Sequence, residues 1–337
     1  MTVYYRPIIQ NDAIKPSNSY HLGGQRQWFD KIEINERGHA PVLVSANKVP
    51  KQSLKSLTNS RQSNHFSCLI KPKIMGILNV TPDSFSDGGK NLEYSKAFSA
   101  AEAMIAEGAD LIDIGGESTR PGAKAISQEE ELIRIELVLK NLKSKYPSCK
   151  ISVDTRKSLV MARAIRLGVD LINDVSAMTF DRKSIEVLAK ENTPVCLMHG
   201  GLNPEKMQEN IVYDNVLFDV YDYLKKSIKF AIAGGIKKEN ILVDPGIGFG
   251  KTNEQNTVLI QKASLFHSLG VPLLYGVSRK RFIGDIGGAQ MPTERFPGSV
   301  AVALELIRQG VQFIRVHDVK ETKQAFDLWN AVTNGEN

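Results

Sequence analysis

The sequence from residue 73 onward alternates eight short apolar runs with stretches of helical character, and this alternation restricts the folds open to the chain. Unbroken apolar runs are typical of parallel strands that are buried on both faces. Eight such strands, with helices between them over about 260 residues, predict a (β/α)8 TIM barrel of the α/β class. The predicted strands are residues 74–80, 110–114, 150–154, 170–174, 194–198, 241–244, 272–277 and 313–316.

The segments between these runs have the spacing and the end signals of helices. In the stretch 133–142, Ile135, Val138 and Leu142 fall on one face at helical spacing. Gly168 ends another such stretch directly before a predicted strand, as expected for a helix C-cap in a short connection. A doubly wound sheet is the competing fold, but it would usually have fewer strands and a glycine-rich turn after the first.

Charge is distributed unevenly along the chain. The 337 residues include 43 Lys and Arg against 37 Asp and Glu, a net charge of +6. Residues 1–73 hold 11 of the basic and 4 of the acidic residues, so the other 32 basic and 33 acidic residues leave the body of the chain nearly neutral. We therefore divide the chain into a basic N-terminal extension, residues 1–72, and a barrel, residues 73–337.

The extension is rich in Asn, Ser, Gln and Lys. We expect it to contain one or two short strands or helices, a flexible connector over residues 48–64 and no independent core. We expect it to pack against the barrel or a partner subunit. A basic tail that binds an acidic partner is the alternative, but nucleic acid is not expected because no aromatic-interleaved RNA-binding motif is present.

Composition also indicates where the protein works. No apolar run approaches the roughly 18–20 residues that a membrane span needs, and the first residues lack the pattern of a signal peptide. Three widely spaced cysteines, Cys68, Cys149 and Cys196, suit free thiols in a reducing compartment. We expect a cytoplasmic protein without a membrane partner.

Polar residues gather at the carboxyl ends of the predicted strands, which in a barrel meet on the face where active sites lie. A single Asp at such a position, for example Asp154, can simply cap the following helix. Turn chemistry alone would favour Gly, Ser and Asn, so a mixture of Arg, Lys, His and Asp indicates a functional site. The residues are Asn79, Glu117, Thr119, Arg120, Asp154, Asn173, His199, Asp244, Lys280, Arg315 and His317.

The glycine-rich segment DPGIGFGKT, residues 244–252, ends like a Walker A loop. Pro245 occupies the place of the first glycine that this loop requires, and the spacing also misses the dinucleotide pattern GxGxxG. We interpret the segment as a tight turn in which Gly248 lets the backbone approach a flat ligand. A mononucleotide site is the weaker alternative.

Two longer segments, MGILNVTPDSFSDGG at 75–89 and DIGGESTRPG at 113–122, resemble the signature motifs of the dihydropteroate synthase family. Five shorter segments follow in the family's order: SVDT at 152–155, IND at 172–174, DPGIGFGK at 244–251, GVSRK at 276–280 and RVHDV at 315–319. The resemblance covers the chain from about residue 73 to its end. It implies a folate-pathway transferase that condenses (hydroxymethyl)dihydropterin diphosphate with 4-aminobenzoate, giving dihydropteroate and pyrophosphate.

The resemblance also implies which residues bind the pterin. The carboxylates of Asp154 and Asp244 would accept hydrogen bonds from the amino-pyrimidinone edge of the ring. The amide of Asn173 can donate and accept, and Lys280 would donate to a ring carbonyl or nitrogen. The apolar walls of this site would be Met198 and Phe249.

The diphosphate calls for positive charge and hydrogen-bond donors. Arg315 and His317 are two residues apart on the last strand and so share one face. Asn79 matches the family residue that reaches both the diphosphate and a bound Mg2+, a cofactor that diphosphate oxygens and water would otherwise hold. Thr119 and Arg120 would lie on a mobile loop that closes over the substrate.

The resemblance implies a second pocket, for 4-aminobenzoate. The loops 81–90 and 117–124 would order over the diphosphate and place Phe85 and Pro121 against the aminobenzoate ring. We expect pyrophosphate to leave before the weakly basic arylamine attacks, so that no strong general base is needed. Sulfonamides, as mimics of 4-aminobenzoate, should compete for this pocket.

The sequence departs from the family in two places. Arg281 stands where many members carry a small Ser near the aminobenzoate carboxylate, and it could pair with that carboxylate or turn into solvent. The segment 198–204 differs from the common Met-His-x-x-Gly form, which leaves the role of His199 open. The family suggests a homodimer packed through barrel helices.

Three other functions compete with this interpretation, and one of them is a nucleic-acid binder that would use the basic extension. The pterin-binding barrels of corrinoid-dependent methyltransferases share the fold but need no diphosphate site, so Asn79, Arg315 and His317 argue against them. A non-catalytic pterin-binding protein would be expected to lose residues of the two loops, and both loops are intact.

Overall fold

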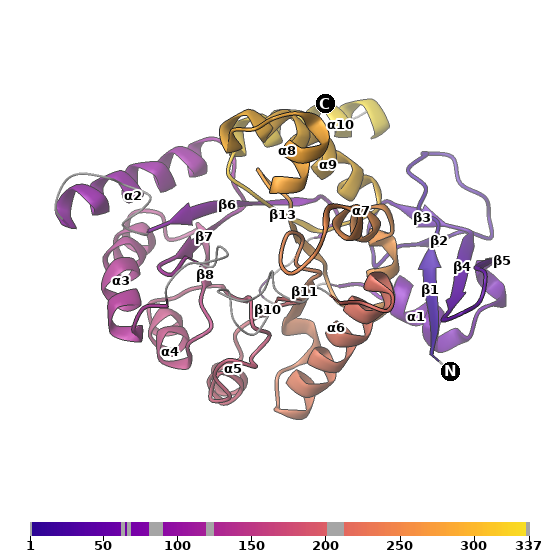
Figure 1. Cartoon of the computed structure of the whole chain (residues 1–337), viewed down its shortest axis with the longest axis horizontal. Coiled ribbons are helices and arrows are strands. Elements are labelled where there is room, and N and C mark those ends of the chain that lie inside the picture. Colours follow the sequence, from indigo (N-terminus) through magenta and orange to yellow (C-terminus); the bar gives the residue numbers. More distant parts are fainter. Residues whose placement is uncertain are drawn as a thin grey trace.

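The eight predicted strands form one parallel sheet that closes into a barrel (Figure 1). The computed structural model describes residues 2–61, 65, 69–80, 90–118, 125–200 and 212–334. The sheet order is β11-β10-β9-β8-β7-β6-β13-β12. A bridge between Val243 of β11 and Leu273, directly before β12, joins the two ends of this order. The TIM barrel is therefore confirmed. The strands are β6 (Lys73–Asn79), β7 (Leu111–Gly115), β8 (Lys150–Asp154), β9 (Leu171–Asp174), β10 (Val195–Met198), β11 (Ile241–Asp244), β12 (Leu274–Gly276) and β13 (Phe313–Val316).

Helices surround the barrel and are positioned by their own end signals. The side chain of Ser127 caps α3 by accepting from the Glu130 N–H, and the predicted apolar face of this helix is buried. Gly168 has a φ of +87°, as the predicted helix C-cap requires. The helices are α2 (Lys90–Ala106), α3 (Gln128–Lys145), α4 (Ser158–Arg166), α5 (Ser184–Glu191), α6 (Val216–Ala233), α7 (Asn253–Gln261), α8 (Arg281–Gly287), α9 (Phe296–Arg308) and α10 (Val319–Asn334), with 3-10 turns η3 (Lys238–Asn240), η4 (Ala263–Leu269) and η5 (Pro292–Arg295).

Apolar residues fill the interior of the barrel near the amino ends of its strands. They form a separate buried cluster inside the ring, distinct from the larger core between the sheet and the helices. This cluster fills the barrel at that end and forms its floor, below the polar residues at the opposite end. Its members are Leu69, Met75, Leu111, Leu171, Cys196, Leu242, Leu274 and Phe313.

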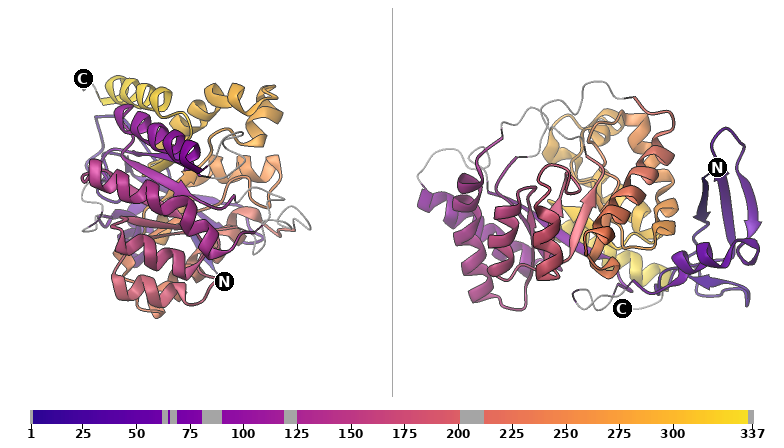
Figure 2. Two further views of the ribbon diagram at one scale, coloured as in Figure 1. Left: turned by 90° about the vertical axis from the view of Figure 1, so that its left-hand side faces the viewer. Right: turned by 90° about the horizontal axis from the view of Figure 1, so that it is seen from below.

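The N-terminal extension has more regular structure than predicted. Its strands are β1 (Val3–Pro7), β2 (Tyr20–His21), β3 (Trp28–Phe29), β4 (Lys31–Glu36) and β5 (Val42–Ser45), followed by the turn η1 (Ala46–Lys48) and helix α1 (Lys51–Thr58). Strands β1, β4 and β5 form an antiparallel sheet beside the barrel (Figure 2). The expected flexible connector was wrong, because α1 occupies it. The helix has only a narrow apolar side, centred on the buried Leu57, which its polar composition concealed.

The extension packs against the barrel, as expected. Tyr4 joins the main core, where its ring stacks on Phe218 of α6 at a centroid distance of 4.2 Å and its hydroxyl donates to Asp222 at 2.8 Å. Arg37 forms ion pairs with Asp214, Asp219 and Asp222 around the same helix. The extension also has a buried cluster of its own. Whether this cluster is a core that folds without the barrel is a separate question, so the expected lack of an independent core stays a prediction. The members of that cluster are Ile9, Leu22, Phe29, Ile32, Ala46, Val49 and Leu57.

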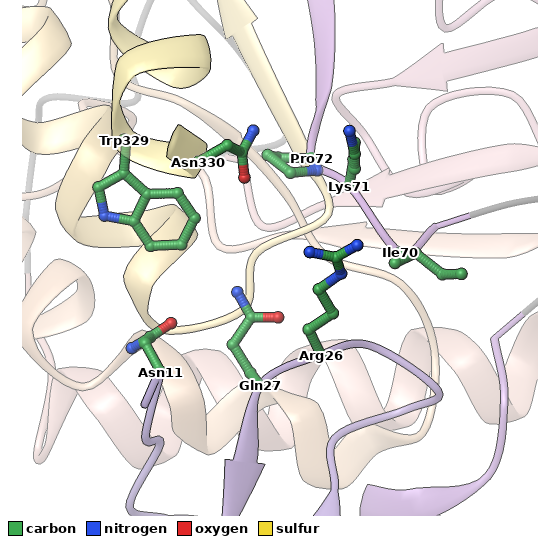
Figure 3. Close-up of a pocket in the computed structure, with 8 residues that line it drawn as sticks. All are labelled: Asn11, Arg26, Gln27, Ile70, Lys71, Pro72, Trp329 and Asn330. Atoms are coloured by element: carbon green, nitrogen blue, oxygen red, sulfur yellow. The ribbon is translucent and has the colours of Figure 1, made fainter. Parts of the chain in front are cut away.

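The extension also meets α10. Arg26 and Gln27 are directed toward Trp329 and Asn330 near the end of that helix and line a small pocket there (Figure 3). None of the described helices combines the length and the apolar character that a membrane crossing requires.

The packing of Tyr4 gives a prediction for stability. We expect Tyr4→Ala to lower the free energy of unfolding by about 3–5 kcal/mol, because a fully buried aromatic ring is lost. Tyr4→Phe, which keeps the ring and removes only the hydroxyl, should lower it by about 1 kcal/mol. Urea denaturation measures both changes, and equal stability of the two variants would contradict this packing.

Candidate active site

Polar side chains project into the barrel directly above its apolar floor. Side chains two residues apart on a strand point the same way, so each floor residue fixes the direction of the residue two positions later. Leu111 is followed in this way by Asp113, and Leu242 by Asp244. The same spacing places Asn173, Met198 and Arg315 at this level, above Leu171, Cys196 and Phe313.

The guanidinium of Arg315 ties three strands together. Its Nε donates to Asp113 Oδ2 at 2.6 Å, and Nη2 donates to Asp154 Oδ2 at 3.2 Å. Asn173 Nδ2 donates to the same Asp113 oxygen at 3.1 Å. Gly276 lies beside Arg315 in the register of β12 and β13. One cation thus holds two buried carboxylates above the floor.

This arrangement leaves hydrogen-bond acceptors available. Among the described residues, Oδ1 of Asp113 and Oδ1 of Asp154 are both buried and have no hydrogen-bond partner. Burial and the neighbouring Asp113 carboxylate raise the pKa of Asp154 to about 8. A ligand that presents N–H donors would satisfy these oxygens and favour the ionised carboxylate.

A second wall is formed by the turn after β11 and by Lys280. Asp244 accepts the Gly246 N–H at 2.7 Å, and burial raises its pKa to about 6. The ammonium of Lys280 lies 4.3 Å from the ring centroid of Phe249, within cation–π range. Gly248 has a φ of +82°, and a side chain there would press on Lys280 at 3.1 Å. The wall therefore combines a carboxylate, an ammonium and an aromatic face.

Lys251 holds this wall from behind. Its buried ammonium donates to the carbonyls of Gly246 and Phe249 at 2.8 and 2.9 Å and lies 3.0 Å from His199 Nδ1. Burial lowers the pKa of Lys251 to about 7 and that of His199 to about 3. The structure thus places His199 behind this wall, in contact with the ammonium of Lys251.

Asn79 and His317 lie near the carboxyl ends of β6 and β13. Asn79 pairs with Gly115 in the register of β6 and β7, and a side chain at Gly115 would meet both Asn79 Oδ1 and Asp154 at about 3.7 Å and 3.6 Å. The missing side chain thus keeps the space between Asn79 and Asp154 open. His317 Nδ1 is 3.0 Å from Ser278 Oγ, which also accepts the His317 N–H at 3.1 Å.

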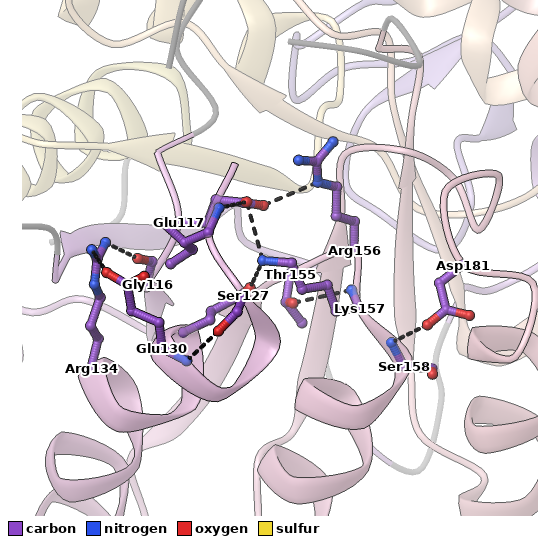
Figure 4. A network of polar contacts seen from close by, with 12 residues as sticks. Gly116, Glu117, Ser127, Glu130, Arg134, Thr155, Arg156, Lys157, Ser158 and Asp181 are labelled. Atoms are coloured by element: carbon purple, nitrogen blue, oxygen red, sulfur yellow. Dashed lines mark hydrogen bonds and ion pairs between the residues drawn. The ribbon is translucent and has the colours of Figure 1, made fainter. Parts of the chain in front are cut away.

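A buried ionic cluster fixes the base of the loop that begins after β7 (Figure 4). Glu117 accepts from Arg156 Nε at 3.0 Å and from Lys157 Nζ at 3.1 Å. The same carboxylate accepts the N–H of Ile126 at 3.1 Å, which joins the two ends of the segment 117–126. Lys157 also donates to Glu131 of α3 at 2.6 Å. The loop is therefore anchored at its base by one carboxylate.

The structure brings together the predicted residues that it describes at the mouth of the barrel. Capping does not explain Asp154, because α4 begins at Ser158, four residues beyond it, and carries Lys157 at its N-cap. Arg281 lies in solvent, with its side chain 88% exposed and paired with Asp285. The predicted residues Phe85, Thr119, Arg120 and Pro121 lie outside the described part of the chain.

Sequence reasoning missed three contributors to the site. Asp113 has a recognisable signal, since it is a charged residue inside an apolar strand. Lys251 was noted only as part of a turn. The pairing of Glu117 with Lys157 spans 40 residues of sequence and has no local signal.

Comparisons with known proteins agree with this geometry. Residues 75–317 match the family described as pterin binding enzyme. The dihydropteroate synthase of Haemophilus influenzae is 43% identical over 263 residues, covering 78% of this chain and 94% of the relative, and that of Neisseria meningitidis serogroup B is 46% identical over 270 residues with the same coverage. The structure of Xanthomonas albilineans dihydropteroate synthase with 4-aminobenzoic acid superposes with a TM-score of 0.74 at 42% identity, covering 79% of this chain and 94% of that one.

The pKa of Asp154 gives a prediction for stability against pH. A carboxyl whose pKa is raised in the folded chain binds a proton that the unfolded chain has already lost, so its contribution to stability falls as pH rises from about 4 to about 8. We expect the stability of Asp154→Asn relative to the wild type to rise progressively across this range and to stay level above it. Thermal unfolding at several pH values measures the difference, and a difference independent of pH would contradict the assignment.

Proposed function

This chain belongs to the pterin binding enzyme family, and we propose from its geometry how its residues carry out dihydropteroate synthesis. It is a transferase of the folate pathway that joins (hydroxymethyl)dihydropterin diphosphate to 4-aminobenzoate and releases pyrophosphate. The observation that carries the residue assignments is the pair of unpartnered carboxylate oxygens, on Asp113 and Asp154, above the barrel floor.

The pterin ring would bind with its amino-pyrimidinone edge toward these carboxylates. Asp154 would accept its N–H donors, and Asn173, held by Asp113, would complete the polar edge. Asp244 would accept from the other side of the ring system. Phe249 and Met198 would supply the apolar faces, and the ammonium of Lys280 would donate to a ring carbonyl or nitrogen.

The diphosphate would lie at the carboxyl ends of β13 and β6. The guanidinium of Arg315 and the imidazole of His317 would donate to its oxygens, together with Thr119 and Arg120 of the loop after β7. Asn79 offers one amide oxygen, a hard ligand that fits a Mg2+ ion held otherwise by diphosphate oxygens and water. Bound Mg2+ would supply charge neutralisation to the leaving group.

The reaction needs one bond to break and one to form. The bond between the exocyclic methylene and the diphosphate oxygen breaks, and pyrophosphate leaves with the electron pair. Asp154 and Asp244 stabilise the cation that the dihydropterin ring delocalises, since both carboxylates face it. The amine of 4-aminobenzoate then forms the carbon–nitrogen bond and loses a proton to water, with Phe85 and Pro121 against its ring.

Further properties follow from this assignment. Sulfonamides would compete with 4-aminobenzoate; the related Yersinia pestis dihydropteroate synthase has been solved as a sulfonamide drug complex.

The distribution of cysteines supports a cytoplasmic location, and the family suggests a homodimer. Since Arg281 is exposed, we expect it to leave the aminobenzoate carboxylate to other groups.

The assignment of Arg315 can be tested by pyrophosphate release from (hydroxymethyl)dihydropterin diphosphate with Mg2+ and 4-aminobenzoate. We expect release coupled to dihydropteroate formation, and a loss of roughly 100-fold or more in kcat/KM for Arg315→Ala, because a donor to the leaving group is removed. Arg308→Ala, at the exposed end of α9, is the control. Turnover of Arg315→Ala within threefold of the wild type would refute the role of this arginine.

The role of Glu117 at the base of the loop gives a separate prediction. Glu117→Gln should raise the KM for 4-aminobenzoate by about tenfold and leave the dissociation constant of a pterin without the diphosphate within about threefold, because the loop is proposed to contact the aminobenzoate and the diphosphate but not the pterin ring. Glu131→Gln is the matched control, since it breaks an ion pair with the same Lys157 without touching the loop. If the two variants change KM equally, Glu117 has no specific effect on the loop.

A further inference from the structure

A cavity of about 250 Å3 lies between helix α1 of the extension and the floor of the barrel. The barrel side of its wall consists of Lys238 and Glu239, directly before β11, and the segment 270–272, directly before β12. These segments are at the amino ends of the strands, opposite the candidate active site. The extension side of the wall is formed by Gln52, Lys55, Ser56, Asn59, Ser60 and Arg61.

Arg61 is a buried cation for which the described part of the chain provides no carboxylate partner. Its side chain is only 6% exposed, and its guanidinium bonds to His267 through Nδ1 at 2.6 Å and through the backbone carbonyl at 2.9 Å. Both groups are uncharged, because burial and Arg61 itself lower the pKa of His267 well below its usual value. The Nε of Arg61 is buried and has no hydrogen-bond partner among the described residues. A charge held in this way is costly unless something compensates it.

Neighbouring residues add to this positive charge. Lys55 and Lys238 line the same cavity, and within the described residues neither they nor Arg61 forms an ion pair. Burial and the charge of Arg61 lower the pKa of Lys238. The sequence contains no acidic residue between Glu36 and Asp83, so the stretch around Arg61 offers no compensation. Glu239 is the one carboxylate in the wall described here, against three cations.

We propose that this cavity binds the phosphate group of a small molecule. A doubly charged oxyanion would neutralise the excess of two positive charges and accept hydrogen bonds from the lysines. Ser56, Ser60, Asn59 and Gln52 offer uncharged donors around it. The volume leaves room beyond the phosphate itself, which suits a phosphate ester as well as free phosphate.

A ligand in this position would join the extension to the barrel. It would bridge α1 to the segments that lead into β11, which ends at Asp244, and into β12, which ends four residues before Lys280. The relatives compared above cover 78–79% of this chain, and the family match begins only at residue 75. The α1 side of the cavity lies before that point and outside the family match, whereas the barrel side lies within it, so the complete cavity depends on the extension. The small pocket beside Trp329 has a volume of only about 20 Å3 and carries no comparable argument.

Isothermal titration of the whole protein with inorganic phosphate tests the proposal. We compare the wild type with Lys55→Gln/Lys238→Gln, and use Lys51→Gln/Lys237→Gln, which removes two exposed lysines outside the cavity wall, as the matched control. The lysines are chosen because substitution of the buried Arg61 could prevent folding. Phosphate binding at the candidate active site is common to all three proteins, so only the difference between them reports on the cavity.

We expect the wild type and the control to show one phosphate site more per chain than the double variant, or a site that the double variant binds at least about tenfold more weakly. Catalytic turnover should be unchanged in all three, which shows that they are folded. A second titration with adenosine monophosphate separates the two sources: a difference confined to inorganic phosphate identifies a free-ion site, and a difference with both identifies a phosphate-ester site. Identical phosphate binding by the wild type and the double variant would overturn the proposal.

Discussion

The hydrogen bonds that the Arg315 guanidinium donates to Asp113 and Asp154 are the interaction on which the mouth of the barrel depends. Parallel strands bring carboxylates from β7 and β8 close together inside a closed ring, where two uncompensated charges could not both persist. A guanidinium from β13 lies between them, and Asn173 of β9 completes the contact. The cation stabilises the pair but leaves one oxygen on each carboxylate without a partner. The polar site is therefore already formed without a ligand. The positions of the two unpartnered oxygens determine where a ligand has to place its hydrogen-bond donors.

The groups that hold the shape of the site are different from the polar side chains that are proposed to contact the substrate. The floor of the barrel is apolar and fully buried, and it fixes the direction of each polar side chain above it. Behind the second wall, Lys251 donates to two backbone carbonyls of the turn after β11. Gly246 allows that turn to approach His199, because a side chain at Gly246 would lie 2.0 Å from the His199 carbonyl oxygen. Glu117 plays the corresponding part for the loop after β7. Lys251 and Glu117 are both buried, and each forms several hydrogen bonds, which are stronger in the protein interior than at an exposed ion pair.

The sequence predicted the barrel well because buried parallel strands leave unbroken apolar runs, and all eight runs became strands. It also predicted Asp154, Asn173, Asp244 and Lys280 at the mouth, since strand ends in a barrel converge. It failed for the extension, where the short strands and the helix Lys51–Thr58 each place at most two side chains, such as Leu57, in buried positions. It missed Asp113 as a partner of Arg315 because that contact spans 202 residues and depends on closure of the sheet.

The buried carboxyl groups at the mouth of the barrel are proposed to accept hydrogen bonds from the N–H groups of a ligand. Proton release on ligand binding tests this claim most directly. In the free protein the pKa of Asp154 is raised to about 8, so near pH 7 this group is largely protonated. Titration of a pterin without the diphosphate, in buffers of different ionisation enthalpy, measures the protons exchanged. The account predicts release of close to one proton per chain by the wild type and none by Asp154→Asn. Binding without proton release, or equal release by the two proteins, would contradict it.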